Sequence, residues 1–278
     1  MTDKNKNIDT LIPDIQERLT SGKPFDAETV SEFSKNLSAK LANRLAESRG
    51  RPTLRLSNVG TPCERKLWYS INTPEAAAPL SASTRLKFLF GDILEEVVLF
   101  LARASGHRVE REQEEVNVGD VKGHIDAVVD GELVDVKSAS TYSFKKFKEG
   151  GLKTSDAFGY LHQLGAYLSA VGGKRGHFLA VDKTLGHLTL DTHEKTDIDY
   201  EAMVKAKQAM LAQSEPPPRA YQDEADGKSG NRKLGLACSY CPFSKTCWPG
   251  SRTFAYSRGP VTLTKVERLP DVPEITSD

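Results

Sequence analysis

The dipeptide Asp130-Gly131 constrains the fold of this chain more than any other short feature of the sequence. Both residue types tolerate the positive φ angles that a two-residue type I′ turn requires, so the pair is a strong hairpin signal. On either side of it the repeat of apolar residues approaches two, which is the period of a strand. We therefore expect two antiparallel strands, over about 124–129 and 132–138, joined by this turn.

The length of the turn also sets which residues face each other across the hairpin. Asp126 falls directly opposite Asp135 on one face, with Cβ atoms about 5 Å apart, and Lys137 projects from the same face. Two ionised carboxylates in a partly apolar setting are costly, and an oxygen-liganded divalent cation such as Mg²⁺ or Mn²⁺ would explain them. The alternative is an edge hairpin whose Asp and Lys side chains face water.

Apolar periodicity places helices and further strands around the hairpin and predicts an α/β fold. Asp26 is suited to cap the first of the helices. A proline run at 216–218 ends the last helix, and the polar, Gly-bearing segment 223–232 predicts a mobile loop. The expected helices are 27–48, 84–105, 156–171 and 198–213, and the expected further strands are 176–182 and 187–191.

Composition gives little sign of the partner, because basic and acidic residues both number 38. Residues 32–66 carry a local basic excess that could meet phosphates or could be a solvated helix face. No stretch has the roughly 18 consecutive apolar residues of a membrane span, and no signal peptide is evident. We therefore expect an intracellular, cytoplasmic protein without a membrane partner. The basic residues of the segment are Lys35, Lys40, Arg44, Arg49, Arg51, Arg55, Arg65 and Lys66.

The chain has four cysteines, Cys63, Cys238, Cys241 and Cys247, which would suffice for one four-ligand inorganic site. In a reducing compartment such thiols hold metal more often than they form disulfides, so two disulfide bridges are the weaker alternative. Four thiolates suit tetrahedral Zn²⁺ and an iron-sulfur cluster alike. Either group would tie Cys63 to the C-terminal triplet.

Several of these segments together resemble the RecB-like branch of the PD-(D/E)XK nucleases. GHID at 123–126 is similar to the first metal carboxylate motif of that family, and DVK at 135–137 to its acidic-x-Lys motif. QLGAY at 163–167 resembles the Gln-x-x-x-Tyr motif, and Glu95 stands where relatives carry His or Glu. One early and three late cysteines resemble the iron-sulfur subgroup, which includes CRISPR-associated RecB-like exonucleases and phage exonucleases.

The resemblance extends from about Cys63 to Trp248 and implies an αβββαβ core, in which helices flank a mixed central sheet. It also implies that a cysteine-ligated cluster joins the N- and C-terminal segments. The expected division is an N-terminal helical extension at 1–50, a nuclease domain at 51–250 and a C-terminal tail at 251–278.

The resemblance further implies a role for each matching residue. Asp126, Asp135, Glu95 and the backbone carbonyl of Val136 would bind Mg²⁺ or Mn²⁺, although many relatives have Glu in place of Asp135. Lys137 would orient the attacking water or stabilise charge on the phosphoryl group, while Gln163 and Tyr167 would position DNA. Cys63, Cys238, Cys241 and Cys247 would hold a [4Fe-4S] cluster, with Zn²⁺ as the alternative.

The expected activity is metal-dependent exonucleolytic hydrolysis of DNA by a phage-type enzyme of host DNA degradation, replication or recombination. Alternatives are a CRISPR-associated endonuclease or exonuclease that trims DNA ends and a non-catalytic DNA-binding module. A homo-oligomer and a recombination or replication partner protein stay open, as does polarity. His124 could contact metal or phosphate, or it could be a hydrogen-bonded structural residue. Four aromatic residues could stack on bases or pack over the cluster: Trp68, Tyr69, Phe243 and Trp248. Four lysines could guide DNA or form a solvated face: Lys145, Lys146, Lys148 and Lys153.

Overall fold

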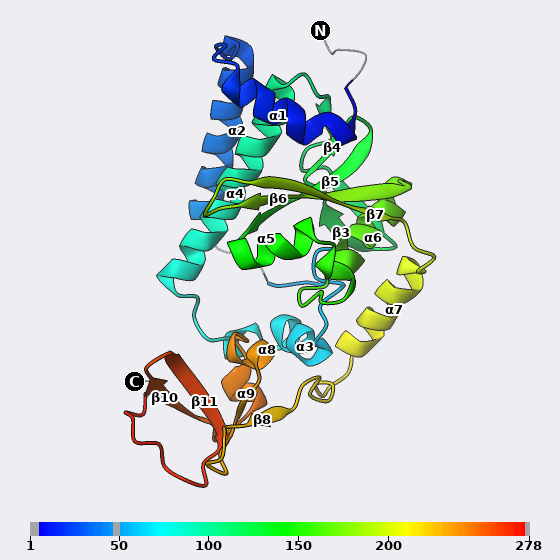
Figure 1. The fold of residues 1–278 in the computed structure, drawn as a ribbon. Coiled ribbons are helices and arrows are strands. Elements are labelled where there is room, and N and C mark those ends of the chain that lie inside the picture. The colour runs from blue at the N-terminus through cyan, green and yellow to red at the C-terminus, as the bar shows by residue number, and fades with distance from the viewer. Residues whose placement is uncertain (1–5, 47–50, 276–278) are drawn as a thin grey trace. The chain divides into compact units, whose positions relative to one another are not determined.

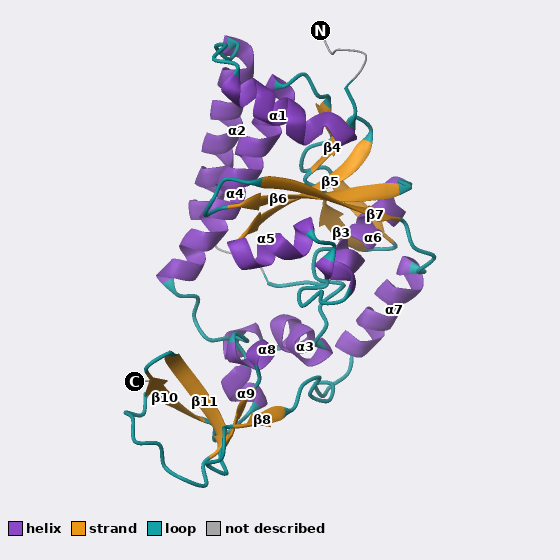
Figure 2. Cartoon of the chain, viewed as in Figure 1, coloured by secondary structure: helices purple, strands orange, loops and turns teal. Residues whose placement is uncertain are grey.

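The computed structural model describes residues 6–46 and 51–275, which form two compact units (Figures 1 and 2). The first unit consists of the described parts of 1–50 with 54–60 and 80–206. The second unit consists of 51–53, 61–79 and the described part of 207–278. These limits differ from the expected division of the chain, because segment 61–79 groups with the C-terminal part and not with the hairpin that follows it.

The first unit is a mixed α/β structure. Its 3₁₀ helices are Ile8–Thr10 and Gly151–Lys153. Its helices are α1 (Leu11–Thr20), α2 (Ala27–Ala46), α4 (Ala82–Ala104), α5 (Thr141–Lys148), α6 (Tyr160–Val171) and α7 (Tyr200–Leu211), whose last turn belongs to the second unit. Its strands are β1 (Val109–Glu110), β2 (Glu115–Val118), β3 (Val121–His124), β4 (Ala127–Val129), β5 (Glu132–Ala139), β6 (Arg175–Asp182) and β7 (Leu188–Glu194).

Five strands make the central sheet in the order β1-β4-β5-β6-β7, and β2 pairs separately with β3. β5 and β6 are parallel, whereas the other neighbours in the sheet are antiparallel. The expected mixed sheet is therefore confirmed. The predicted hairpin register is confirmed from Ala127 to Val134, since Val129 pairs with Glu132 and Ala127 pairs with Val134. The expected strand 124–129 was too long, because β4 begins only at Ala127 and His124 belongs to β3.

Helices cover both faces of this sheet, as Figure 1 shows for the first unit. Strand β6 points Leu179 and Val181 into a core with α1 and α4, and it points Phe178 and Ala180 into a second core with α5 and α6. This alternation follows from the two-residue period of a strand. Because both of its faces are buried, β6 is continuously apolar from Phe178 to Val181. It pairs with the neighbouring strand β5, which carries the candidate site.

Capping residues set the helix starts. Thr29 N donates a hydrogen bond of 2.8 Å to Asp26 Oδ1, which confirms the predicted cap of α2. Residues 47–48 of the expected first helix lie outside the described residues. The third expected helix was placed too early, because the carboxylate of Asp156 accepts backbone N–H groups through Leu161 and the helix begins only at Tyr160.

The second unit combines short helices with an antiparallel sheet of order β10-β11-β9-β8. The prediction of a mobile loop at 223–232 is wrong, because the ends of that segment pair as β8 and β9. Residues 252–265 of the expected tail form the other two strands. The elements are α3 (Glu64–Asn72), a 3₁₀ helix at Pro74–Ala76, β8 (Asp223–Ala225), β9 (Arg232–Leu234), α8 (Leu236–Ser239), α9 (Ser244–Cys247), β10 (Arg252–Tyr256) and β11 (Gly259–Lys265).

Across the described residues, none of the helices has the length and apolarity needed to span a membrane.

Candidate active site

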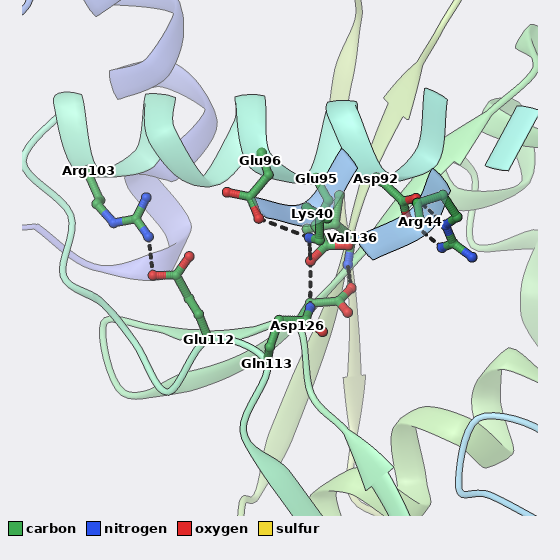
Figure 3. Close-up of polar contacts among 10 residues, drawn as sticks. All are labelled: Lys40, Arg44, Asp92, Glu95, Glu96, Arg103, Glu112, Gln113, Asp126 and Val136. Carbon is green, nitrogen blue, oxygen red and sulfur yellow. Dashed lines mark hydrogen bonds and ion pairs between the residues drawn. The ribbon is translucent and has the colours of Figure 1, made fainter. Parts of the chain in front are cut away.

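Two acidic side chains and one lysine converge where β4 meets β5. Asp135 and Lys137 are two residues apart on β5, and Asp126 directly precedes β4. The backbone N–H of Val136 donates to Asp126 Oδ2 at 2.7 Å, which ties the Asp126 carboxylate to β5 (Figure 3). All four residues line one cavity of about 300 Å³. The turn-based prediction that the two carboxylates share one side of the hairpin is therefore confirmed.

Gln163 on α6 links the members of this group. Its Nε2 donates to Asp135 Oδ1 at 3.2 Å, while its Oε1 accepts from Lys137 Nζ at 3.4 Å. Lys137 also forms an ion pair with Asp135. Because an amide has both a donor and an acceptor, Gln163 can satisfy the carboxylate and the ammonium group together and hold them in one arrangement.

Tyr160 completes the wall of the cavity next to Lys137. Its ring centroid lies 4.6 Å from Lys137 Nζ, which is cation–π distance. Tyr160 precedes Gln163 by three residues on α6, so the two side chains share a helix face. That spacing was visible in the sequence and could have identified Tyr160 as a site residue, although it was not among those predicted.

Tyr167 lies behind the cavity. Only 2% of it is exposed, and it is absent from the cavity lining. A Cβ atom added to Gly123 would come within 2.7 Å of its ring, so the tyrosine fills the space beside that glycine. Burial and the charge of Asp135 raise the pKa of Tyr167, while its hydrogen bond with Gln163 opposes the rise. The structure thus places Tyr167 where it can support Gln163 from inside the core.

The carboxylates carry more negative charge than their surroundings favour. Burial, followed by repulsion from Asp135 and Glu95, raises the pKa of Asp126 well above its usual range. Burial lowers the pKa of Lys137, but attraction to Asp135 and Asp126 outweighs it and raises that pKa overall. A divalent cation would favour the ionised form of Asp126, so the electrostatics suit an oxygen-liganded Mg²⁺ or Mn²⁺ ion.

We predict that Asp126→Asn stabilises the metal-free protein more as pH rises. Because the folded-state pKa of Asp126 is raised, the free energy of unfolding of the wild type should fall as pH rises from about 3.9, the ordinary aspartate pKa, to the raised pKa. Above the raised pKa it should level off. Asparagine cannot ionise and escapes this fall. Urea unfolding across this pH range in a chelator measures the effect, with exposed Asp197→Asn as control. Parallel curves for wild type and Asp126→Asn would contradict the prediction.

Glu95, on α4, also lines the cavity, but other side chains already engage it. Its Oε1 accepts hydrogen bonds from Lys40 Nζ at 2.6 Å and from Gln113 Nε2 at 2.7 Å. Lys40 reaches Glu96 Oε1 as well, at 2.9 Å, so its ammonium group bridges two carboxylates (Figure 3). Burial raises the pKa of Glu95, and attraction to Lys40 opposes the rise.

Arg44, also on α2, makes a two-pronged ion pair with Asp92 on α4, with distances of 2.5 and 2.7 Å. Asp92 precedes Glu95 by three residues and shares its helix face, a spacing that could have identified it. Lys40 and Arg44 therefore face the acidic side of α4, and Arg44 also lines the cavity, so a role of the basic segment in meeting phosphates stays a prediction. Arg49 of the same basic segment lies outside the described residues.

His124 does not reach the cavity. Its ring is about half exposed and lies 3.9 Å from Glu115 across the β2–β3 pair. A distance of 3.9 Å is too long for a hydrogen bond, so the structural role of this histidine and its contact with metal or phosphate both stay predictions.

The four cysteines all lie in the second unit as free thiols, so the disulfide alternative is not realised. Burial and the charges of the other three cysteines raise the pKa of Cys238, which shows that the thiols influence one another. Even so, among residues 6–46 and 51–275 no three His, Cys, Asp or Glu side chains form a group ready to hold a metal ion. The iron-sulfur and zinc assignments stay predictions.

Three of the four aromatic residues near the cysteines belong to the core of the second unit. Tyr69 stacks on Phe243 with ring centroids 5.6 Å apart, and Trp68 packs edge-on against Tyr69. All three are buried, so the base-stacking alternative is wrong for them. The half-buried Trp248 lies beneath the guanidinium of Arg219, 4.0 Å from ring centroid to Cζ.

No protein-family model matches this sequence, and no curated protein matches it. Among solved structures, the chain is similar to the crystal structure of SSO0001, with 20% identity and a TM-score of 0.46, covering 78% of this chain and 95% of that one. It is also similar to LHK-Exo, an alkaline exonuclease from Laribacter hongkongensis, with 16% identity, a TM-score of 0.37 and coverages of 63% and 92%. For the complex of LHK-Exo with dAMP, the identity is 14% and the TM-score is 0.39, and the match covers 64% of this chain and 89% of that one. Likeness at this level assigns no family, and the candidate site rests on the contacts described above.

Proposed function

We propose that this chain is a metal-dependent DNA nuclease that hydrolyses phosphodiester bonds from strand ends. One observation carries the proposal: Asp126, Asp135 and Lys137 meet in one cavity, and Gln163 hydrogen-bonds two of them. Carboxylates that disfavour each other's charge, beside a buried lysine, are the groups that phosphodiester hydrolysis needs. A non-catalytic DNA-binding module would have no use for this arrangement.

Asp126 and Asp135 would hold Mg²⁺ or Mn²⁺, with the Val136 carbonyl as a further ligand. The bound ion would supply charge neutralisation at the phosphate and a water that loses its proton readily. Glu95 is the weaker candidate ligand, since Lys40 and Gln113 already hydrogen-bond its Oε1.

Lys137 would act as a cation and hydrogen-bond donor, not as a base. Its pKa is raised by attraction to the two aspartates, so it keeps its proton at neutral pH. From its place beside Asp135 it can donate to an oxygen of the phosphate or orient the attacking water. Gln163 would keep the ammonium group aimed, and Tyr167 would support Gln163.

Digestion of end-labelled DNA tests the proposal. We expect nucleotides to be released from linear DNA with Mg²⁺ or Mn²⁺, and no release in a chelator or from closed circles. Cleavage of circles would instead favour the endonucleolytic, CRISPR-type alternative, and DNA binding without cleavage would favour the non-catalytic module. The phage role is a further prediction that follows from the resemblance. A location in the host cytoplasm, a homo-oligomer and a recombination or replication partner also stay predictions.

For the cysteines we propose a structural [4Fe-4S] cluster, with Zn²⁺ as the alternative. Cys63 is the N-cap residue directly before α3, whereas the other three cysteines follow β9, so a shared group would join segment 61–79 to the C-terminal part of the second unit. The soft sulfur donors fit either group, and the raised pKa values of Cys238 and Cys241 mean that binding at these two thiols would release protons.

Anaerobic purification with metal and sulfide analysis checks this assignment. We expect iron and acid-labile sulfide at about four equivalents each, as the cluster formula requires, with broad visible absorption. Cys238→Ser should lose both and unfold more easily, whereas the neighbouring Ser239→Ala should retain them. A colourless protein with one zinc per chain would replace the iron assignment by the alternative.

A further inference from the structure

Phe158 is a large apolar side chain held in solvent beside the candidate active site. It is 66% exposed, yet its ring stacks on Tyr160 with centroids 5.2 Å apart and planes tilted by 23°. Tyr160 in turn lines the cavity and lies over Lys137. The aromatic stack therefore runs from the protein surface to the ammonium group of the site.

The loop that carries Phe158 is fixed before any ligand arrives. The Asp156 carboxylate accepts the backbone N–H groups of Phe158 and of the three residues after it. Gly159 has a φ of +76°, and a Cβ atom there would lie 1.9 Å from Gly60 O, so the loop is wedged against residues 54–60. A ring held this way loses little conformational entropy on binding.

A second exposed aromatic and a lysine continue this surface on α5. Tyr142 is 77% exposed, and Lys146 Nζ lies 5.8 Å from its ring centroid. Lys146 also donates to Ser155 Oγ at 3.0 Å, which links α5 to the Asp156 loop. We call Tyr142, Lys146 and Phe158 the aromatic strip. Exposed rings alternating with a cation match a strand whose bases are apolar on their faces and whose backbone is anionic.

We propose that the aromatic strip binds single-stranded nucleic acid, with Phe158 stacked on the base of a nucleotide next to the cleaved phosphate. A base inside a duplex has both faces covered by its neighbours, so an unpaired or terminal base is the partner that a fixed ring can accept. The position next to a cleaved phosphate rests on the proposed nuclease function. The inference adds a substrate class to that function, namely strands with unpaired ends.

Fluorescence anisotropy in a chelator tests the strip without requiring catalysis. Phe158→Ala should weaken binding of a labelled single-stranded oligonucleotide about tenfold, as expected for one lost stacking contact. Phe158→Tyr should bind like the wild type, because the ring is retained. Leu19→Ala removes an exposed apolar side chain on α1, away from the strip, and should change nothing.

An abasic scan identifies the stacked nucleotide. Removing one base should weaken wild-type binding about tenfold at a single position, and the same removal should cost Phe158→Ala nothing further. Equal affinity of wild type and Phe158→Ala, or no binding of single strands at all, would overturn the strip. Binding that depends on Phe158 without any hydrolysis would refute the nuclease function but support the binding role of the aromatic strip. Hydrolysis with binding that does not depend on Phe158 would support the nuclease function and refute the role of the strip.

Discussion

Replacing Lys137 with methionine is expected to lower DNA cleavage by about 10³-fold, the upper range for removing one preorganised charged or hydrogen-bonding group from a transition state. The physical reason is the place of its ammonium group, which pairs with Asp135, donates a hydrogen bond to Gln163 Oε1 and lies over the Tyr160 ring. Methionine keeps most of the side-chain volume but offers neither charge nor donor. Single-turnover cleavage of a labelled oligonucleotide measures the effect.

The same change should also weaken the fold, since it leaves the buried Asp135 without its cation. We expect a loss of about 3 kcal/mol in the free energy of unfolding without metal, typical of breaking one side of a buried pair. The exposed Lys174→Met, before β6, provides the matched control and should alter neither quantity. Wild-type cleavage rates in Lys137→Met would exclude the proposed role of the lysine.

Gly159→Ala is expected to destabilise the protein by about 3 kcal/mol, the sum of a left-handed backbone penalty and overpacking. The added methyl group would meet the backbone of Gly60 at 1.9 Å, and backbone on both sides cannot move aside cheaply. Urea unfolding measures the change. The loop that carries Phe158 should shift as well, so binding of single-stranded DNA should weaken in the same variant.

Gly172→Ala separates the two contributions. Gly172 has a similar φ of +71°, but no atom lies within 4 Å of an added Cβ. It should therefore lose only the backbone part, about 1 kcal/mol. Equal losses at the two glycines would show that the contact between Gly159 and Gly60 is not tight.

The hairpin was predictable because its determinants are local. The Asp130-Gly131 turn fixes the strand register, and that register brings Asp126, which directly precedes β4, close to Asp135 on β5. The contact of Lys40 with Glu95 was not predictable in this way, because the two residues are 55 positions apart and no sequence motif contains both. Periodicity indicates that α2 has an apolar face but not which acidic residues its lysine will reach.

The second unit shows where composition misleads. Segment 223–232 is polar and Gly-bearing, yet its ends pair because Arg232 bonds to Asp223 and Thr264 Oγ1 donates to Asp223 Oδ2 at 2.7 Å. The contact of Thr264 with Asp223 joins side chains 41 positions apart, and both contacts supply stabilisation that the segment lacks in apolar residues. Local propensity gave no sign of the third strand that stabilises the hairpin.

The most direct test of the account compares Mg²⁺-dependent release of nucleotides from linear single-stranded DNA by the wild type and by Asp135→Asn. Asparagine preserves the shape of the side chain and its hydrogen bond with Gln163 but removes the charge that would hold the cation. We expect release by the wild type and a rate at least about 10²-fold lower in the variant. Release at equal rates by both proteins, or by neither, would contradict this expectation.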